Sequence, residues 1–261
     1  MGKQYAKKKI YTILIVMLIM MVCLFSTSCA IETRLMINKA IRKTEKLDSI
    51  KSTIQTDVHV SVDANEQTGY ANVKNSTTII VNDVNSASPK VYYSTESKNS
   101  STGLPPVSNS FYIEDGYWYN YSNPGYVPTQ GKKFDYKEYI GDAFILPSNK
   151  ILNNAEITKD DKNDITTIKY SIANDDAERF CHYILEQISA ELDDYEDITI
   201  ENVNVKQIIK AGYISEFEIT LNLKMRDNDN SVFASVKSTV KIVNPGRHFE
   251  ITLPKNYPSS K

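Results

Sequence analysis

The fold is decided by the stretch Phe111-Tyr112-Ile113-Glu114-Asp115-Gly116-Tyr117-Trp118-Tyr119-Asn120-Tyr121, which reads as two aromatic strands around a tight turn. An Asp-Gly pair between such strands favours a type I′ hairpin turn, because both central residues need a positive φ. Side chains alternate between the two faces of a strand, so Tyr117, Tyr119 and Tyr121 are expected on one face and Trp118 on the other. One of these faces must pack on a core. The candidate ligand or partner contacts are the outward-facing members of the set Tyr117, Trp118, Tyr119 and Tyr121.

Alternating polar and apolar residues extend the strand pattern on both sides of this hairpin. Asp57-Val58-His59-Val60-Ser61-Val62-Asp63 is typical of a half-buried strand. Residues 219–225 alternate in the same way after a turn at Lys210-Ala211-Gly212. Further strands are predicted at 70–81, 90–97, 154–159, 165–173, 198–205, 232–243 and 249–254. The chain is therefore expected to form a series of antiparallel hairpins.

Two segments have the residue spacing of helices. From 31 to 53, apolar residues recur at three- and four-residue intervals without Gly or Pro. Two interpretations stay open for this helix, namely packing on the core or lying on a bilayer as an amphipathic helix. The second helix has a capping box in Asp175 and Glu178, followed by an apolar stripe. Helices on one face of an antiparallel sheet give an α+β fold, and a sheet of many strands tends to curl. We therefore predict a curled antiparallel sheet, or half-open β-barrel, covered by helices.

The first 28 residues have the layout of an export signal. Basic residues between Lys3 and Lys9 precede an apolar run from Ile10 to Phe25, and small residues then lead to Cys29. This layout resembles the lipobox of bacterial lipoproteins, with Ser26 where those proteins usually have an aliphatic residue. Lipidation of Cys29 is the favoured interpretation, while cleavage by the ordinary secretory peptidase and retention as an uncut anchor are the alternatives. The predicted division is a signal peptide at 1–28 and one domain at 29–261.

Charge and cysteine content argue against several classes of function. Residues 1–28 hold four of the 30 Lys and Arg residues and none of the 32 Asp and Glu residues, so the remainder has a net charge of −6. An acidic domain argues against nucleic acid as a partner. Beyond the signal peptide only Cys29 and Cys181 remain, and lipidation would use the first, so no intramolecular disulfide and no thiolate metal site is expected.

Residues that carry chemistry are scattered along the chain. His59, His182 and His248 lie far apart without ligand spacing around them. Cys181 and His182 are adjacent on the predicted helix and point in different directions, so they form no nucleophile–base pair. We expect no catalytic residue, no metal site and no cofactor, and hence a protein that is not an enzyme.

The chain resembles the LolA/LppX-like superfamily of lipoprotein and lipid carriers, and within it a family of Gram-positive lipoproteins. The resemblance covers about residues 30–255. It is carried by the lipobox, the first helix, the hairpin with Asp115-Gly116, the motif Gly131-Lys132-Lys133-Phe134 and the ending Asn244-Pro245-Gly246-Arg247-His248-Phe249-Glu250-Ile251-Thr252-Leu253-Pro254. It implies a LolA-like half-barrel whose concave, apolar sheet face can hold an acyl chain.

Taken together, these features predict a non-enzymatic lipoprotein on the extracytoplasmic face of the cell membrane. Its lipid anchor would be one partner, and a lipid or other apolar ligand in the half-barrel cavity would be another. The alternative is a cell-envelope protein-interaction or sensing module without a ligand cavity, whose partner contacts the outer face of the aromatic hairpin.

Overall fold

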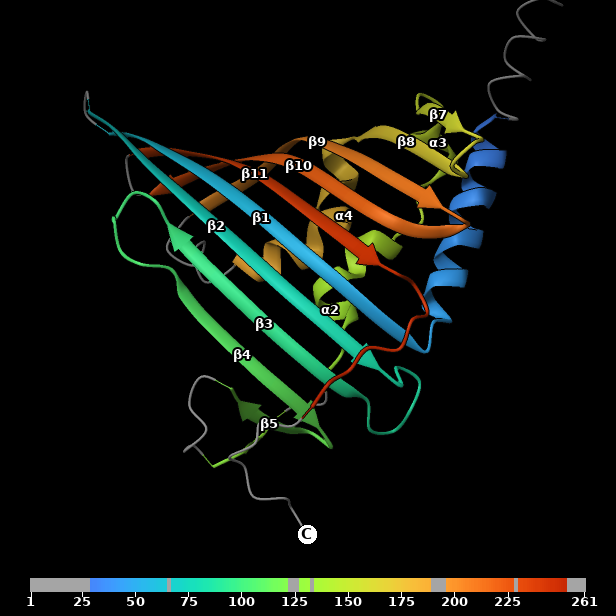
Figure 1. The fold of residues 1–261 in the computed structure, drawn as a ribbon. Helices are drawn as coiled ribbons and strands as arrows, with labels where there is room; N and C mark the ends of the chain where they lie inside the picture. The colour runs from blue at the N-terminus through green and yellow to red at the C-terminus, as the bar shows by residue number, and fades with distance from the viewer. Residues whose placement is uncertain are drawn as a thin grey trace, which may run out of the picture.

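The computed structural model describes residues 29–64, 67–121, 127–131, 134–188, 196–227 and 230–252. Within these residues the chain forms one antiparallel sheet of eleven strands, in the order β6-β5-β4-β3-β2-β1-β11-β10-β9-β8-β7 (Figure 1). The strands are β1 Ser49–Ala64, β2 Gln67–Asn82, β3 Lys90–Asn99, β4 Val107–Glu114, β5 Tyr117–Asn120, β6 Thr129–Gln130, β7 Glu156–Asp160, β8 Ile165–Ile172, β9 Glu196–Lys210, β10 Tyr213–Asp227 and β11 Asn230–Val243.

Two meanders make up the sheet. Strands β1 to β6 run outward in sequence order on one side, and strands β11 back to β7 run outward on the other. The first and last strands, β1 and β11, pair at the centre, with Ile54 opposite Val240 and Val58 opposite Val236. The sheet is curled and does not close, and this confirms the predicted α+β half-barrel.

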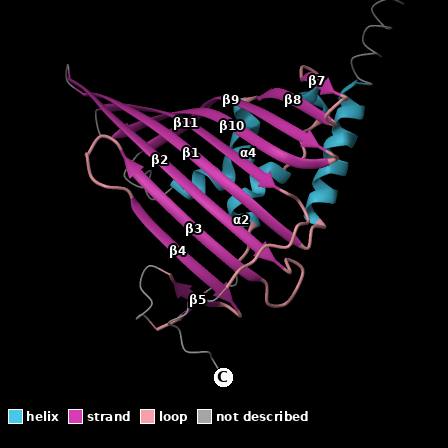
Figure 2. Ribbon diagram, viewed as in Figure 1, coloured by secondary structure: helices cyan, strands magenta, loops and turns pink. Residues whose placement is uncertain are grey.

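Helices cover one face of the sheet, called the inner face here, and the opposite face is called the outer face (Figure 2). The helical elements are residues 29–45, α2 Lys137–Ile140, η1 Gly141–Phe144, α3 Asn149–Leu152 and α4 Asn174–Ile188. Helix α4 packs over β9 and buries Phe180, Cys181 and Ile184. It begins at Asn174, two residues before the start that a cap at Asp175 predicts, so Asp175 lies in its first turn and does not cap it.

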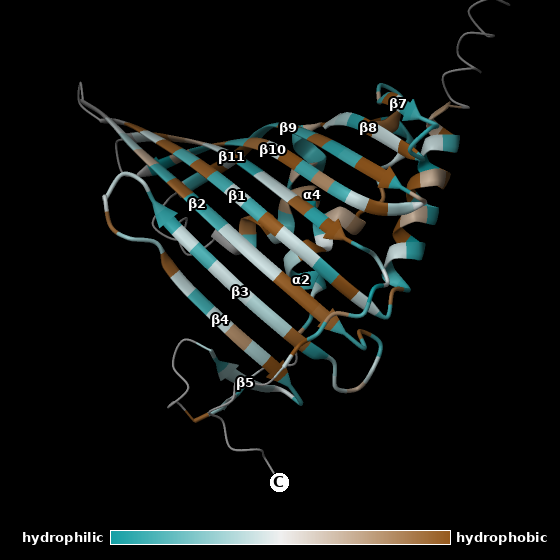
Figure 3. Cartoon of the chain, viewed as in Figure 1, coloured by the Kyte–Doolittle hydropathy of each residue, from teal (hydrophilic) through white to brown (hydrophobic). Residues whose placement is uncertain are grey.

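Hydropathy alternates along the strands, which fixes the inner face as the core (Figure 3). In β11, Val232, Val236 and Ile242 are buried, whereas Ser235 and Lys237 between them are exposed. Burying one face in this period-two pattern specifies the register of each strand pair, because a slip of one residue would exchange the two faces.

The first helix is shorter than the sequence pattern predicts. It ends at residue 45, and the strand β1 begins at Ser49, so the prediction of a helix up to 53 was wrong. Ile50 and Ile54 are four residues apart, a spacing that suits a helix face and equally one face of a strand. Both lie on the inner face, where Ile50 pairs with Val81 and Ile54 with Val240.

The aromatic hairpin forms as predicted. Glu114 pairs with Tyr117, and the two residues between them have positive φ values, 54° at Asp115 and 77° at Gly116. Both central residues therefore have the φ sign of a type I′ turn.

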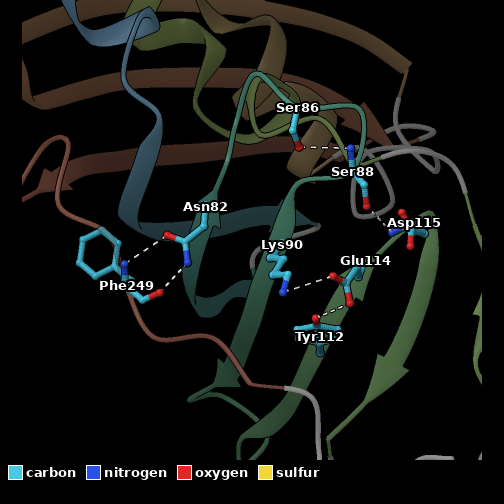
Figure 4. A network of polar contacts seen from close by, with 8 residues as sticks. All are labelled: Asn82, Ser86, Ser88, Lys90, Tyr112, Glu114, Asp115 and Phe249. Atoms are coloured by element: carbon cyan, nitrogen blue, oxygen red, sulfur yellow. Dashed lines mark hydrogen bonds and ion pairs between the residues drawn. The ribbon is translucent and has the colours of Figure 1, made fainter. Parts of the chain in front are cut away.

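The C-terminal segment is not a strand over its described part, and that prediction was also wrong. Residues 249–252 cross the outer face near β2 and β5. Asn82, at the end of β2, exchanges two hydrogen bonds with the backbone of Phe249, so a side chain replaces the ladder bonds of a strand (Figure 4).

Candidate functional site

The hairpin places the four predicted contact residues in three different environments. Trp118 lies on the inner face among the aromatic residues of the core. Tyr119 and Tyr121 lie on the outer face beneath the C-terminal segment, where Ile251 packs against them. Tyr117, on the same face, is 40% exposed. Of the four side chains, only Tyr117 is therefore exposed enough on the outer face to contact a partner.

An inner aromatic cluster surrounds Trp118. It consists of Tyr93, Phe111, Trp118, Phe134 and Tyr139. The rings of Phe134 and Tyr139 are stacked, with centroids 5.3 Å apart, and Trp118 meets Phe111 edge-on at 5.5 Å. Only Phe134 is fully buried, and the other four rings keep partial solvent access. The inner aromatic cluster is therefore an apolar surface that is packed at its base and reachable at its rim.

Strand register and one glycine build this cluster. Tyr93 of β3 lies opposite Phe111 of β4, which places both rings on the inner face. At Gly131, a Cβ atom would come within 2.8 Å of Trp118 Nε1, so the backbone there approaches the indole too closely for any other residue. Trp118 Nε1 is buried and has no hydrogen-bond partner among the described residues. A buried donor in this state costs free energy unless an ordered water binds it.

A hollow of about 390 Å³ adjoins the cluster at Phe134. Its walls are Val81, Val84, Pro89, Phe134, Asp135, Tyr136 and Glu138. Burial raises the pKa of Tyr139 to about 12 and also raises the pKa of Tyr93, so both phenols stay neutral at physiological pH. The hollow itself combines apolar walls with the Tyr136 hydroxyl and the carboxyl groups of Asp135 and Glu138, which suits an apolar molecule that has a small polar end.

Sequence reasoning missed Phe134 and Tyr139 as site residues. In the sequence, Phe134 stands out only as part of the motif Gly131-Lys132-Lys133-Phe134. Tyr139 lies in α2, outside the hairpin. One signal for the cluster was present in the sequence. Val91 and Tyr93 are two residues apart in a strand, so their side chains lie on the same face.

A second, smaller aromatic cluster lies on the outer face. Tyr112 and Tyr119 pack edge-on with centroids 5.6 Å apart, and the Tyr121 hydroxyl donates to the Thr252 carbonyl. The Tyr112 hydroxyl donates to Glu114 at 2.6 Å, and Glu114 also pairs with Lys90 (Figure 4). The Tyr121 bond and the packing of Ile251 hold the C-terminal segment on this cluster.

The first helix presents apolar side chains at its beginning. Its first described residue is Cys29, which is exposed, and the Thr33 hydroxyl donates to the Cys29 carbonyl at 2.8 Å. Ile31 and Leu35, one turn apart, are 49% and 55% exposed. Further along, Ile37 and Ile41 are buried against the core. Ala30 is buried as well, so one face of the helix packs on the core along its described length, and Ile31 and Leu35 form an uncovered apolar edge beside Cys29.

Cys181 has no catalytic environment. Its side chain is buried in α4, and burial raises the pKa of its thiol to about 12, so it stays protonated and unreactive. No group of three or more His, Cys, Asp and Glu side chains within the described residues could hold a metal ion.

Within the described residues, no helix is both long enough and apolar enough to cross a bilayer.

No protein-family model matches this chain. No curated protein matches it either. Its architecture is a curled, unclosed antiparallel sheet with helices on one face. Among solved structures, the half-barrel is similar to LprF from Mycobacterium bovis, with 11% identity and a TM-score of 0.43 over 85% of this chain and 97% of that one. It is also similar to a domain described as an outer membrane lipoprotein-sorting protein from Vibrio parahaemolyticus, with 7% identity and a TM-score of 0.17 over 74% of this chain and 86% of that one. These superpositions are too loose to transfer any residue's role, and the fold assignment of the half-barrel rests on its own sheet.

Proposed function

We propose that this protein is a non-enzymatic lipoprotein, anchored through Cys29 to the extracytoplasmic face of the cell membrane, whose half-barrel binds an apolar ligand. The inner aromatic cluster carries the ligand part of the proposal. Four of its rings keep partial solvent access while they contact one another, so they form a joint apolar surface. An adjoining hollow gives such a ligand space.

The start of the first helix supports the anchor. If Cys29 carries acyl chains, Ile31 and Leu35 lie within two turns of the bilayer, where their exposed side chains would enter the interface. The sequence leaves two interpretations open for this helix, packing on the core and lying on a bilayer, and this arrangement combines them. One face of the helix packs on the core, and the exposed edge of Ile31 and Leu35 would rest on the membrane.

A brominated fatty acid tests ligand binding directly. The chain contains a single tryptophan, Trp118, so its intrinsic fluorescence reports on the inner aromatic cluster alone. We expect dibromostearate to quench this emission saturably, because bromine quenches an indole on contact, and unbrominated stearate to compete. Tyr139→Ala should weaken the quenching, whereas Tyr117→Ala, on the outer face, should leave it unchanged. Emission that does not respond to dibromostearate would rule out an acyl ligand at this site.

Mass measurement tests the anchor independently. The membrane-associated protein should begin at a diacylated Cys29, and Cys29→Ser should appear unmodified in the soluble fraction. A wild-type chain without acyl groups would refute the anchor while leaving the ligand experiment valid.

One observation favours the second candidate function, a protein-interaction module. Tyr117 lies on the outer face of the hairpin and is 40% exposed. A co-purified envelope protein that is lost with Tyr117→Ala, but kept with Tyr117→Phe, would support this candidate.

A further inference from the structure

Two rows of side chains cross the outer face of five strands at the end of the sheet where β1 joins β2 (Figure 1). The first row contains Asn72, His59, Ser235, Asn222 and Glu201, each paired with the next across the strands. The second row contains Tyr70, Ser61, Phe233, Lys224 and Thr199. A row of hydrogen-bonding groups therefore runs beside a row that holds two aromatic rings.

The two rings are unusually open to solvent. Tyr70 is 72% exposed and Phe233 is 44% exposed, although each is a paired residue of a long strand. Ser61 lies between them, so the rings are two strands apart, about 10 Å in the direction of the ladder hydrogen bonds. A hollow of about 430 Å³ lies over these rows and is lined by both rings together with His59, Asn72, Asn222 and Glu201.

A β-bulge brings the acidic group to this hollow. The register between β10 and β9 slips by one residue between Thr220 and Asn222, and Asn202 takes a positive φ of 53° there. Bulges change the direction in which a side chain points. Here the bulge places Glu201 opposite Asn222, at the end of the polar row. At the other end, His59 Nδ1 and Asn72 Oδ1 are hydrogen-bonded and hold each other in position.

We propose that this outer-face platform binds a carbohydrate chain. Tyr70 and Phe233 would stack on the apolar faces of two sugar rings, and the groups of the polar row would bond to their hydroxyls. The ring spacing of about two strands matches the distance between sugars that present the same face in an extended β-linked glycan. Amide, imidazole and carboxylate groups supply both donors and acceptors, as a polyhydroxylated ligand requires.

Charge and shape favour this ligand class over others. The lining has one acidic group, Glu201, and one basic group, Lys224, so it offers no excess charge to a lipid headgroup, a nucleic acid or a phosphate. The apolar area is limited to two separated rings, which suits a ligand of alternating polar and apolar character better than a purely apolar one. The platform lies on the opposite face from the inner aromatic cluster and does not depend on it.

Saturation-transfer NMR with three oligosaccharides tests the platform. The probes are chitotetraose, cellotetraose and maltotetraose added to the purified protein. At least one should receive saturation from the aromatic protons and give a heat of binding by calorimetry. Tyr70→Ala and Phe233→Ala should each weaken that binding by about fivefold, as expected for loss of one stacked ring.

Two control variants keep the result clear. Tyr70→Phe keeps the ring and should retain binding, and Tyr117→Ala removes an exposed tyrosine elsewhere on the outer face and should change nothing. The proposal is overturned if none of the three oligosaccharides binds, or if binding survives both alanine substitutions. It is also overturned if those substitutions abolish self-association of the protein and leave its response to sugars unaltered.

Discussion

The side chain of Asn82 and the backbone of Phe249 form two hydrogen bonds with each other across 167 residues of sequence. Asn82 Nδ2 donates to the Phe249 carbonyl, and Asn82 Oδ1 accepts from the Phe249 N–H at 3.2 Å. Asn82 is 2% exposed, so water does not compete for these bonds. This pair, the hydrogen bond of Tyr121 and the packing of Ile251 hold the C-terminal segment on the outer face.

Removing this pair should release the C-terminal segment. We expect Asn82→Ala to lower the free energy of unfolding by about 2 kcal/mol, since two buried hydrogen bonds are lost. Urea denaturation measures that change, and limited proteolysis should show new cleavage near residues 247–252. The control is Asn85→Ala in the neighbouring turn, where the side chain is exposed. Equal stability of the two variants would mean that the segment is held by other contacts.

Gly141 should not tolerate a side chain. A Cβ atom there would lie 2.2 Å from Tyr183 Cε2, although the backbone φ of −62° is acceptable for any residue. We expect Gly141→Ala to lower the free energy of unfolding by about 1–3 kcal/mol through overpacking. Gly69→Ala is the matched control, because a Cβ atom at that position meets nothing within 4 Å. Thermal denaturation of the double variant Gly141→Ala/Tyr183→Ala should show recovery if the clash is the cause.

Asp142 should make stability depend on pH. Burial raises the pKa of its carboxyl to about 7, although the backbone N–H groups of Tyr183 and Ile184 donate to it and oppose the rise. The charges of His182 and Glu186 also act on it, in opposite directions. Because the carboxyl pKa is higher in the native state than the unfolded value of 3.8, the native state binds more protons than the unfolded state between about pH 4 and pH 7. The contribution of Asp142 to the free energy of unfolding is therefore complete below about pH 4 and is lost as the pH rises through about 7.

Denaturation at a series of pH values checks this dependence. The free energy of unfolding should fall with a slope approaching 1.4 kcal/mol per pH unit. Asp142→Asn keeps one acceptor oxygen and cannot ionise, so it should flatten the slope. An unchanged slope in the variant would assign the pH dependence to other groups.

Tyr170 should be replaceable by phenylalanine. Its hydroxyl is buried on β8 and has no hydrogen-bond partner among the residues described, and burial raises its pKa. Tyr170→Phe removes an unsatisfied polar group, so the free energy of unfolding should stay the same or rise by about 1 kcal/mol. Tyr112→Phe is the contrasting control, because it loses the bond to Glu114 and should destabilise. Clear destabilisation by Tyr170→Phe would show that the hydroxyl has a partner such as water.

The hairpin was predictable from sequence because its determinants are local. Asp115-Gly116 sets the turn, and the alternating aromatics set the faces. The end of the first helix was not predictable in the same way. The four-residue spacing of Ile50 and Ile54 suits a helix and a strand equally. Only their pairing with residues of β2 and β11 decides that they lie in a strand. The C-terminal segment failed as a strand for a related reason, since its hydrogen bonds are made by the distant side chain of Asn82.

The candidate site was predictable only in part. Alternation placed Trp118 on the face opposite Tyr117, as observed. Phe134, which contacts Trp118, and Tyr139, which stacks on Phe134, belong to segments with no strand pattern, and these contacts form only in the folded protein. The platform of Tyr70 and Phe233 depends on the register of β1 with two partners, which no local pattern specifies.

The pairing of β1 with β11 has a consequence for how the chain is made. Thr56 and Ser238, which bond across this seam, are 182 residues apart. A polypeptide that emerges from its N-terminus first can build the meander β1 to β6 early, but β1 keeps one unpaired edge until β11 has been synthesised. Such an edge, rich in Val and Ile, is a site for misassociation between incomplete chains. The middle of the finished sheet is therefore its last part to be completed, and a truncation within β11 should damage the centre of the protein and leave its margins paired.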